Sequence, residues 1–152
     1  MRSLIIAFLF VPLTLMAQER FTHGPSGFSF ELPAGWTYVG EGDHFEASSP
    51  DETIHLMFMV GKPGEVEEAM MDAVHGLDSV MTDSAISTEP TSVEINGVTQ
   101  YYVEGYGNVD DVRIDWDLTL CVGSKKNMVI IALGDIDSNQ EMINKIYESI
   151  QE

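Results

Sequence analysis

The sequence predicts an α+β fold in which a mostly antiparallel sheet is covered by two helices. Three observations predict it. Several short stretches alternate apolar and polar residues, as half-buried strands do. An Asn-Gly pair at 96–97 stands between two such stretches and is typical of a tight hairpin turn. Two longer stretches, 63–84 and 139–150, repeat apolar residues at helical spacing, and two such helices need a sheet to cover.

The chain before the first helix predicts strands. The first of them, 28–32, alternates aromatic or aliphatic residues with polar ones and ends at Pro33. A second short segment covers 36–38. Strands over 44–48 and 53–60 form a predicted hairpin.

The stretch 63–84 predicts the first helix. Pro63 suits the first helical position, and the carboxylates of the first turn are favoured by the helix dipole. The apolar residues fall on one stripe, which indicates a helix lying on a sheet with its other side in water. This stripe consists of Val66, Ala69, Met70, Ala73, Val74, Leu77, Val80 and Met81.

The second half of the chain predicts further strands and a closing helix. A strand follows the Asn-Gly turn, and 112–121 alternates apolar and polar residues over a longer run. The stretch 128–133 is apolar throughout, which indicates a central strand covered on both faces. Ser138 and Glu141 form a predicted capping box that starts the last helix.

Residues 1–17 have the features of a secretory signal peptide. Arg2 precedes an apolar run, and Ala17 is a small residue before the predicted cut. The run is shorter than the ~20 residues of a spanning helix, and an uncleaved anchor is the alternative. We therefore expect an exported protein, periplasmic or extracellular, with no membrane span after signal removal. A flexible lead-in, 18–26, is expected before a single domain over 27–152.

The composition narrows the class of partner. Seven Lys and Arg stand against 25 Asp and Glu, and the formal net charge is −18. This balance argues against binding to nucleic acid or to anionic lipid, because both need clustered cations. One cysteine rules out a disulfide framework, a multi-cysteine zinc site and an iron–sulfur cluster. No cofactor is expected.

The stretch 28–36, which ends in Pro-x-Gly-Trp, resembles the opening of the PsbP-like family. The order of the predicted elements resembles that family over 27–150. The family includes a lumenal subunit of photosystem II, a eukaryotic Ran-binding import factor and many small exported bacterial proteins of unknown role. The resemblance implies a PsbP-like fold and action by docking on larger partners. It supplies no catalytic residues.

His44, Glu46 and His55 are candidate metal ligands on the predicted hairpin. If its loop spans 49–52, Glu46 lies opposite His55 and His44 lies opposite Met57, all on one face. Two imidazoles and a carboxylate so placed can hold a divalent transition metal. The alternative is an ordinary contact between a histidine and a glutamate on a polar face.

Two further acidic groups are open to three interpretations. Asp110 and Asp111 share a turn, and Asp115 and Asp117 lie on one face of a strand. Such a face is ordinarily solvated. A weak divalent-cation site, calcium above all, and a basic protein partner are both consistent with the net charge.

Enzyme motifs are missing from the sequence. It has no Gly-x-Ser-x-Gly, no His-Glu-x-x-His and no phosphate-binding Gly-x₄-Gly-Lys motif. His23 and Ser26 fall in the lead-in, where we expect them to be too mobile for catalysis. Cys121 is expected as a half-buried packing residue.

Tyr102 and Tyr106 are candidate partner-binding residues. Tyr101 and Tyr102 are adjacent on a strand, so one ring faces each side of the sheet, and an outer ring beside Tyr106 can anchor a partner. We expect a non-enzymatic protein that docks on an envelope or secreted protein. The alternative is a small-ligand or divalent-cation binder. A hydrolase ranks third, because no spacing singles out a pair of carboxylates.

Overall fold

A computed structural model describes residues 18–62 and 64–152 of the chain. The predicted signal peptide, 1–17, and Pro63 lie outside the described residues. The elements follow in the order β1 (Glu19–Thr22), β2 (Ser29–Leu32), β3 (Thr37–Glu41), β4 (His44–Ser48), β5 (Ile54–Gly61), α1 (Val66–Leu77), β6 (Thr82–Ile86), β7 (Thr91–Ile95), β8 (Val98–Val109), β9 (Val112–Val122), β10 (Asn127–Gly134) and α2 (Ile136–Glu148).

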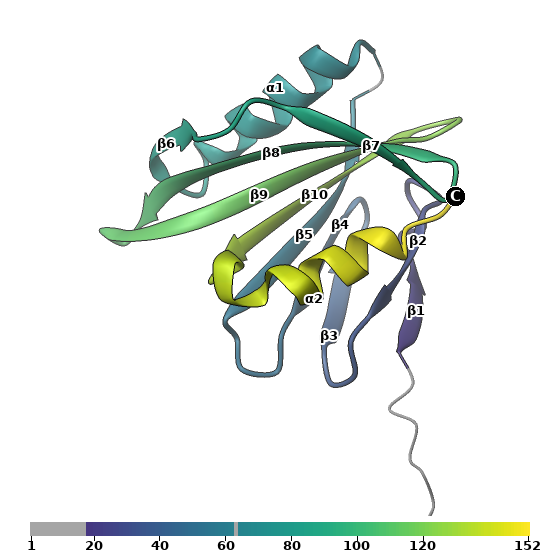
Figure 1. Ribbon diagram of the computed structural model, residues 1–152, viewed down its shortest axis with the longest axis horizontal. Coiled ribbons are helices and arrows are strands. Elements are labelled where there is room, and N and C mark those ends of the chain that lie inside the picture. The colour runs from purple at the N-terminus through teal and green to yellow at the C-terminus, as the bar shows by residue number, and fades with distance from the viewer. Residues whose placement is uncertain (1–17, 63) are drawn as a thin grey trace, which may run out of the picture.

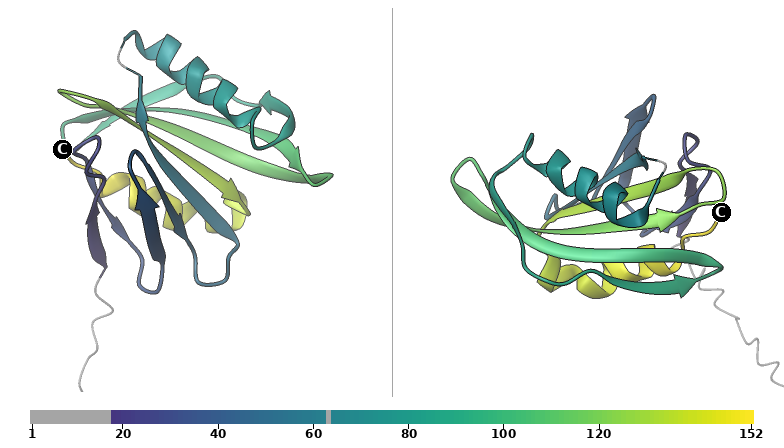
Figure 2. Two further views of the ribbon diagram at one scale, coloured as in Figure 1. Left: turned by 180° about the vertical axis from the view of Figure 1, so that it is seen from behind. Right: turned by 90° about the horizontal axis from the view of Figure 1, so that it is seen from above.

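One large antiparallel sheet forms the centre of the molecule. Its strands lie in the order β3-β4-β5-β10-β9-β8-β6, and β7 pairs with β8 beside β6. The helix α1 covers one face, while α2 and the small β1–β2 sheet lie on the opposite face (Figure 1, Figure 2). This arrangement confirms the α+β class. β10 is buried over most of its length between β5 and β9, as its apolar run predicts.

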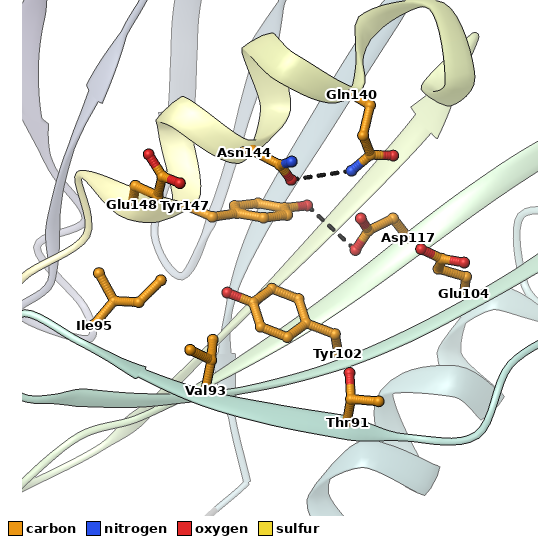
Figure 3. A pocket seen from close by; sticks show the side chains of 10 residues that line it. All are labelled: Thr91, Val93, Ile95, Tyr102, Glu104, Asp117, Gln140, Asn144, Tyr147 and Glu148. Atoms are coloured by element: carbon orange, nitrogen blue, oxygen red, sulfur yellow. Dashed lines mark hydrogen bonds between the residues drawn. The ribbon is translucent and has the colours of Figure 1, made fainter.

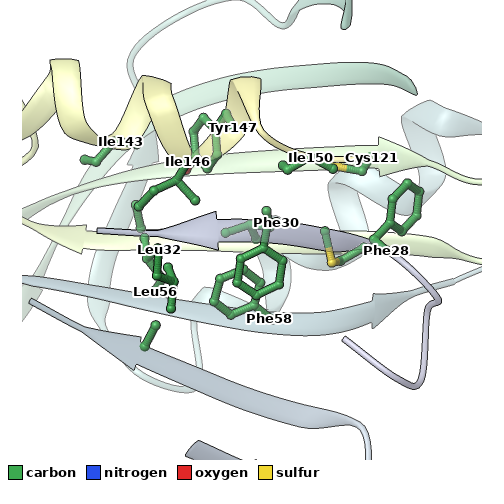
Figure 4. Packing of buried hydrophobic residues seen from close by; sticks show 14 of the residues in the cluster. Phe28, Phe30, Leu32, Leu56, Phe58, Cys121, Ile143, Ile146, Tyr147 and Ile150 are labelled. Atoms are coloured by element: carbon green, nitrogen blue, oxygen red, sulfur yellow. The ribbon is translucent and has the colours of Figure 1, made fainter. Parts of the chain in front are cut away.

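The core on the α2 side is rich in aromatic rings. Phe30 of β2 stacks on Phe58 of β5 with ring centroids 4.3 Å apart and planes 7° apart (Figure 4). Tyr38 meets the edge of the same Phe30 ring at 5.6 Å. Ile143 and Ile146 of α2 close this cluster from above. The apolar side chains of the predicted alternation at 28–32 therefore face the sheet and α2.

The core on the α1 side uses the predicted helical stripe. Ala69, Met70 and Leu77 are buried against the sheet, in one cluster with Leu118 and Leu120 of β9. The polar side of the helix is exposed, as the stripe predicts.

Three expectations about element boundaries are wrong. The segment 18–26, expected as a flexible lead-in, contains β1, which pairs with β2 over four residues. The first helix begins at Val66 and ends at Leu77, and residues 82–84 belong to β6. The second helix has Asp135, not Ser138, at its N-cap, where the Asp135 side chain accepts from the Ser138 amide at 3.3 Å.

Two glycines offer a matched test of the packing. A Cβ at Gly105 on β8 would overlap the Trp116 ring and the carbonyl oxygen of Ala85. We expect Gly105→Ala to lower the free energy of unfolding by about 2–3 kcal/mol, since both neighbours must move. At Gly76 in α1, nothing lies within 4 Å of the added atom. Gly76→Ala should raise stability by about 0.5–1 kcal/mol, and urea unfolding of both variants checks the opposite signs.

Candidate functional site

Two opposed carboxylates mark the α2 face of the sheet. Glu104 of β8 lies directly across from Asp117 of β9 in the strand register. Side chains in such a position have Cβ atoms about 5 Å apart, and like charges there repel each other. Tyr147 of α2 covers Asp117 from above, and Figure 3 shows its hydroxyl directed at that carboxylate. The pair therefore lies where the sheet and the helix meet.

The Asp117 carboxylate is buried and accepts only long, weak hydrogen bonds. Asp117 is 4 % exposed. Its Oδ1 accepts from the Tyr147 hydroxyl at 3.4 Å and from the Thr119 hydroxyl at 3.5 Å, both long hydrogen bonds. Burial, with a smaller contribution from the nearby Glu104 charge, raises the pKa of Asp117 to about 7. The group thus changes its charge near neutral pH.

A cavity of about 260 Å³ opens beside this pair, between α2 and the hairpin of β7 and β8. Its lining includes three carboxylates, those of Glu104, Asp117 and Glu148, together with the rings of Tyr102 and Tyr147. No Lys, Arg or His is among the described residues that line it. The cavity therefore has negative charge and no internal counterion.

A second cavity of about 280 Å³ continues along the same face toward the start of α2. Glu104 and Gln140 line both cavities, so the two form one groove, which we call the α2 groove. The second part holds Asp115 and Tyr106. Its one cation among the described lining residues is Arg113, which lies 3.6 Å from Asp115 and stacks over the Tyr106 ring at 4.0 Å.

Tyr102 and Tyr106, the candidate partner-binding residues, both line the α2 groove. Tyr102 is half-buried, with its ring centroid 5.9 Å from that of Tyr147, and its hydroxyl donates to the Gln100 side chain. Tyr101 packs on the α1 side, so the two adjacent rings do face opposite sides of the sheet. Contact of Tyr102 or Tyr106 with a partner stays a prediction.

The predicted metal ligands do not come together as expected. His55 pairs with Ser48 and Glu46 pairs with Met57, a shift of two residues from the expected register. His44 Nε2 lies 3.2 Å from Glu46 Oε1 on the exposed surface. The His55 ring nitrogen Nδ1 is instead hydrogen-bonded to the Ser48 hydroxyl at 2.9 Å. No group of three or more His, Cys, Asp or Glu among the described residues is placed to hold a metal ion.

The turn chemistry explains this shift of register. The Ser49 amide donates to the Ile54 carbonyl at 3.0 Å, so the turn between these residues covers 50–53, one residue later in the chain than the expected loop 49–52. Asp51 accepts from the Ser49 hydroxyl at 2.7 Å and from the Thr53 hydroxyl at 2.9 Å, which keeps Thr53 inside the loop. A shift of two residues preserves the shared face but separates Glu46 from its expected partner.

Three other reactive side chains, at two places in the fold, are part of the packed structure. His23 and Ser26, expected in a mobile segment, are buried in an ordered turn, with Nδ1 2.7 Å from the serine hydroxyl. Burial lowers the pKa of His23. Cys121 is fully buried rather than half-buried, and burial raises the pKa of its thiol to about 12. Neither place exposes a nucleophile to a substrate.

The sequence predicts that Asp117 belongs to a solvated acidic face, and that prediction is wrong. Asp115, two residues before it, is exposed, but α2 covers Asp117. The available signal was its position between Trp116 and Leu118 on a strand whose face continues to Thr119 and buried Cys121. Glu104 gave no signal of its own, because its importance comes from the register of β8 against β9.

Comparison with solved structures shows which known fold this chain shares. No protein-family model matches the sequence, and no curated protein matches it. Among solved structures, cyanobacterial PsbP (CyanoP) from Synechocystis sp. PCC 6803 matches with a TM-score of 0.65 at 13% identity, over 93% of this chain and 95% of that one. The protein has a PsbP-like fold. This confirms the resemblance seen in 28–36.

Two more solved structures share the PsbP-like fold. LpqN of Mycobacterium tuberculosis, a protein involved in cell envelope biogenesis, matches with a TM-score of 0.58 at 11% identity, over 89% of this chain and 90% of that one. The protein of unknown function PA94 from Pseudomonas aeruginosa matches with a TM-score of 0.56 at 7% identity, over 87% and 94%. At such identities the likeness concerns the fold.

Among the residues that the structure describes, neither of the two helices of this PsbP-like fold is long and apolar enough to cross a bilayer.

Proposed function

We propose that this protein is a non-enzymatic binding protein whose α2 groove takes up a cationic side chain of an exported protein partner. The observation that carries the proposal is the opposed pair of Glu104 and Asp117, which has no cation beside it among the described residues lining that cavity. A lysine ammonium placed between the two carboxylates relieves their repulsion. It also offsets the cost of the negative charge on the buried Asp117 carboxylate.

The shape of the groove favours a peptide over a compact ligand. Its two cavities, of about 260 and 280 Å³, are each slightly smaller than the usual small-molecule pocket of about 300–1,000 Å³. They lie in series and share lining residues, so a chain can place successive side chains in them. Tyr102 and Tyr106 supply aromatic surface for the aliphatic stem of a lysine.

The net charge of the chain favours the same partner. At −18, the protein attracts a basic partner over several ångströms and repels acidic ones. The predicted signal peptide favours a partner outside the cytoplasm. We propose an envelope or secreted protein on this ground.

Binding of a lysine peptide tests the proposal. We expect a labelled peptide with three lysines to bind at least tenfold more tightly than its acetyl-lysine counterpart, as measured by fluorescence anisotropy at pH 8, because acetylation removes the charge. Glu104→Gln should weaken binding by about tenfold, the effect of one charge-assisted hydrogen bond. Glu46→Gln is the matched control, because Glu46 is exposed on the opposite face of the sheet.

The pH dependence gives a second, independent readout. Asp117 is mostly neutral at pH 6 and mostly ionised at pH 8, since its pKa is about 7. Affinity for the lysine peptide should therefore rise about tenfold from pH 6 to pH 8 and stay flat in Asp117→Asn. Equal affinities for the lysine and acetyl-lysine peptides, with no response to Glu104→Gln, would refute the proposed function.

A further inference from the structure

We propose that a partner segment binds as an added strand on the free edge of β7, with basic side chains entering the α2 groove and apolar ones entering a cavity on the α1 face. This inference rests on the proposed function and adds the mode of recognition. Strand addition supplies affinity through main-chain hydrogen bonds and specificity through alternate side chains.

β7 is an edge strand with a regular ladder. It pairs with β8 over five consecutive residues, Thr91–Ile95, and within the described chain it has no other strand partner. The neighbouring β6 pairs with the same side of β8, but its register shifts between Thr82 and Ala85. An irregular ladder resists the addition of a strand, whereas a regular one is a template for it.

The turn at the end of β7 identifies its outward-facing groups. Asn96 and Gly97 have φ values of 54° and 77°, which is the conformation of a two-residue type I′ turn. Ile95 and Val98 flank this turn and face each other, so they form a hydrogen-bonded pair. Because such pairs alternate along an antiparallel ladder, the main-chain N–H and C=O of Ser92 point away from β8.

A cavity borders β7 on each face of the sheet. Thr91 and Val93 line the acidic cavity of the α2 groove on one face. On the other face, Ser92 lines a cavity of about 510 Å³ between β7 and α1. The side chains that line this second cavity include the carboxylates of Glu65 and Glu67 and five apolar or aromatic groups, namely Val66, Met70, Met71, Pro90 and Tyr101.

The two cavities together define the chemistry of the segment. Alternate residues of an added strand point to opposite faces of the sheet. One set of side chains meets three carboxylates and therefore carries ammonium or guanidinium groups. The other set meets two methionines and a tyrosine, with Met71 43 % exposed, and is therefore apolar where it contacts them, while Glu65 and Glu67 lie at the N-terminal end of α1. The predicted segment alternates basic and large apolar residues.

Peptide order tests the inference. The probe is a capped, labelled heptapeptide of alternating lysine and leucine, compared with a peptide of the same composition in which the lysines and leucines form separate blocks. We expect the alternating peptide to bind at least tenfold more tightly in fluorescence anisotropy. Equal binding of both peptides, abolished by Glu104→Gln, would overturn strand addition while leaving the acidic groove intact. Binding of neither peptide would overturn both proposals.

Ser92→Pro removes the outward N–H without touching the ladder to β8. Proline is tolerated on a free edge for this reason. We expect this variant to lose at least tenfold in affinity for the alternating peptide, while Ser92→Ala, which keeps the N–H, changes affinity less than twofold. Thermal unfolding checks that Ser92→Pro folds. If it does not fold, the same hydrogen bonds can be removed on the peptide by N-methylating every second residue, in one peptide the odd residues and in another the even ones. Unchanged affinity of both methylated peptides would overturn the inference.

Discussion

Asp117→Asn should make the protein more stable above pH 7 and leave it nearly unchanged at pH 4. Asparagine keeps the shape of the side chain and the acceptor oxygen for the Tyr147 and Thr119 hydroxyls. It removes the cost of a buried negative charge. With a shift from 3.8 to about 7, we expect a gain of about 2–4 kcal/mol at pH 8.

The direction of this change in stability with pH follows from proton binding. The folded state holds the Asp117 proton up to pH 7, whereas the unfolded chain releases it near pH 4. Between these values the unfolded state binds fewer protons, so the contribution of Asp117 to stability falls as pH rises and is constant above 7. Urea unfolding at pH 4, 6 and 8 measures the difference between wild type and variant.

Asp115→Asn is the matched control for this experiment. Asp115 lies two residues away on the same strand face, but it is exposed. Its ion pair with Arg113 is at the surface, so the substitution should change stability by less than about 1 kcal/mol at any pH. A constant difference between Asp117→Asn and wild type from pH 4 to pH 8 would contradict the argument.

Phe30→Ala should have the largest effect on stability. The ring is fully buried, stacks on Phe58 and touches Tyr38 and Phe21. Removing it leaves a cavity that the surrounding strands cannot close, and we expect a loss of about 3–5 kcal/mol. Since small domains are stable by about 5–15 kcal/mol, this variant should be near the limit of folding.

Circular dichroism during urea unfolding measures the loss. Val39→Ala on β3, the next strand along the chain, is the control, because Val39 is 64 % exposed and its truncation should cost less than about 0.5 kcal/mol. Similar midpoints for Phe30→Ala and Val39→Ala would show that β2 contributes little to the core, contrary to its packing.

Local patterns predicted most of the elements. The alternation over 28–32 corresponds to β2 and its buried rings, and the Asn-Gly pair corresponds to the turn between β7 and β8. The apolar run at 128–133 corresponds to the central strand β10. These features depend on a residue and its near neighbours, through the period of a strand or the φ values of a turn, so they can be deduced from sequence.

The candidate site was predicted only in part. Tyr102 and Tyr106 do line the α2 groove, because residues four apart on a strand share a face. The metal cluster of His44, Glu46 and His55 does not form, because the Asp51 side chain holds a turn that lies one residue later in the chain than expected, which shifts the strand register by two residues.

By itself, the sequence determined the fold class, the resemblance to a PsbP-like fold and the acidic character of the protein. Only the tertiary structure decided that Asp117 is buried and faces Glu104, and that β7 is a free edge between two cavities. The physical reason is distance along the chain. Asp117 is covered by Tyr147, thirty residues later, and burial by a remote element leaves no pattern in the residues around the one that is buried.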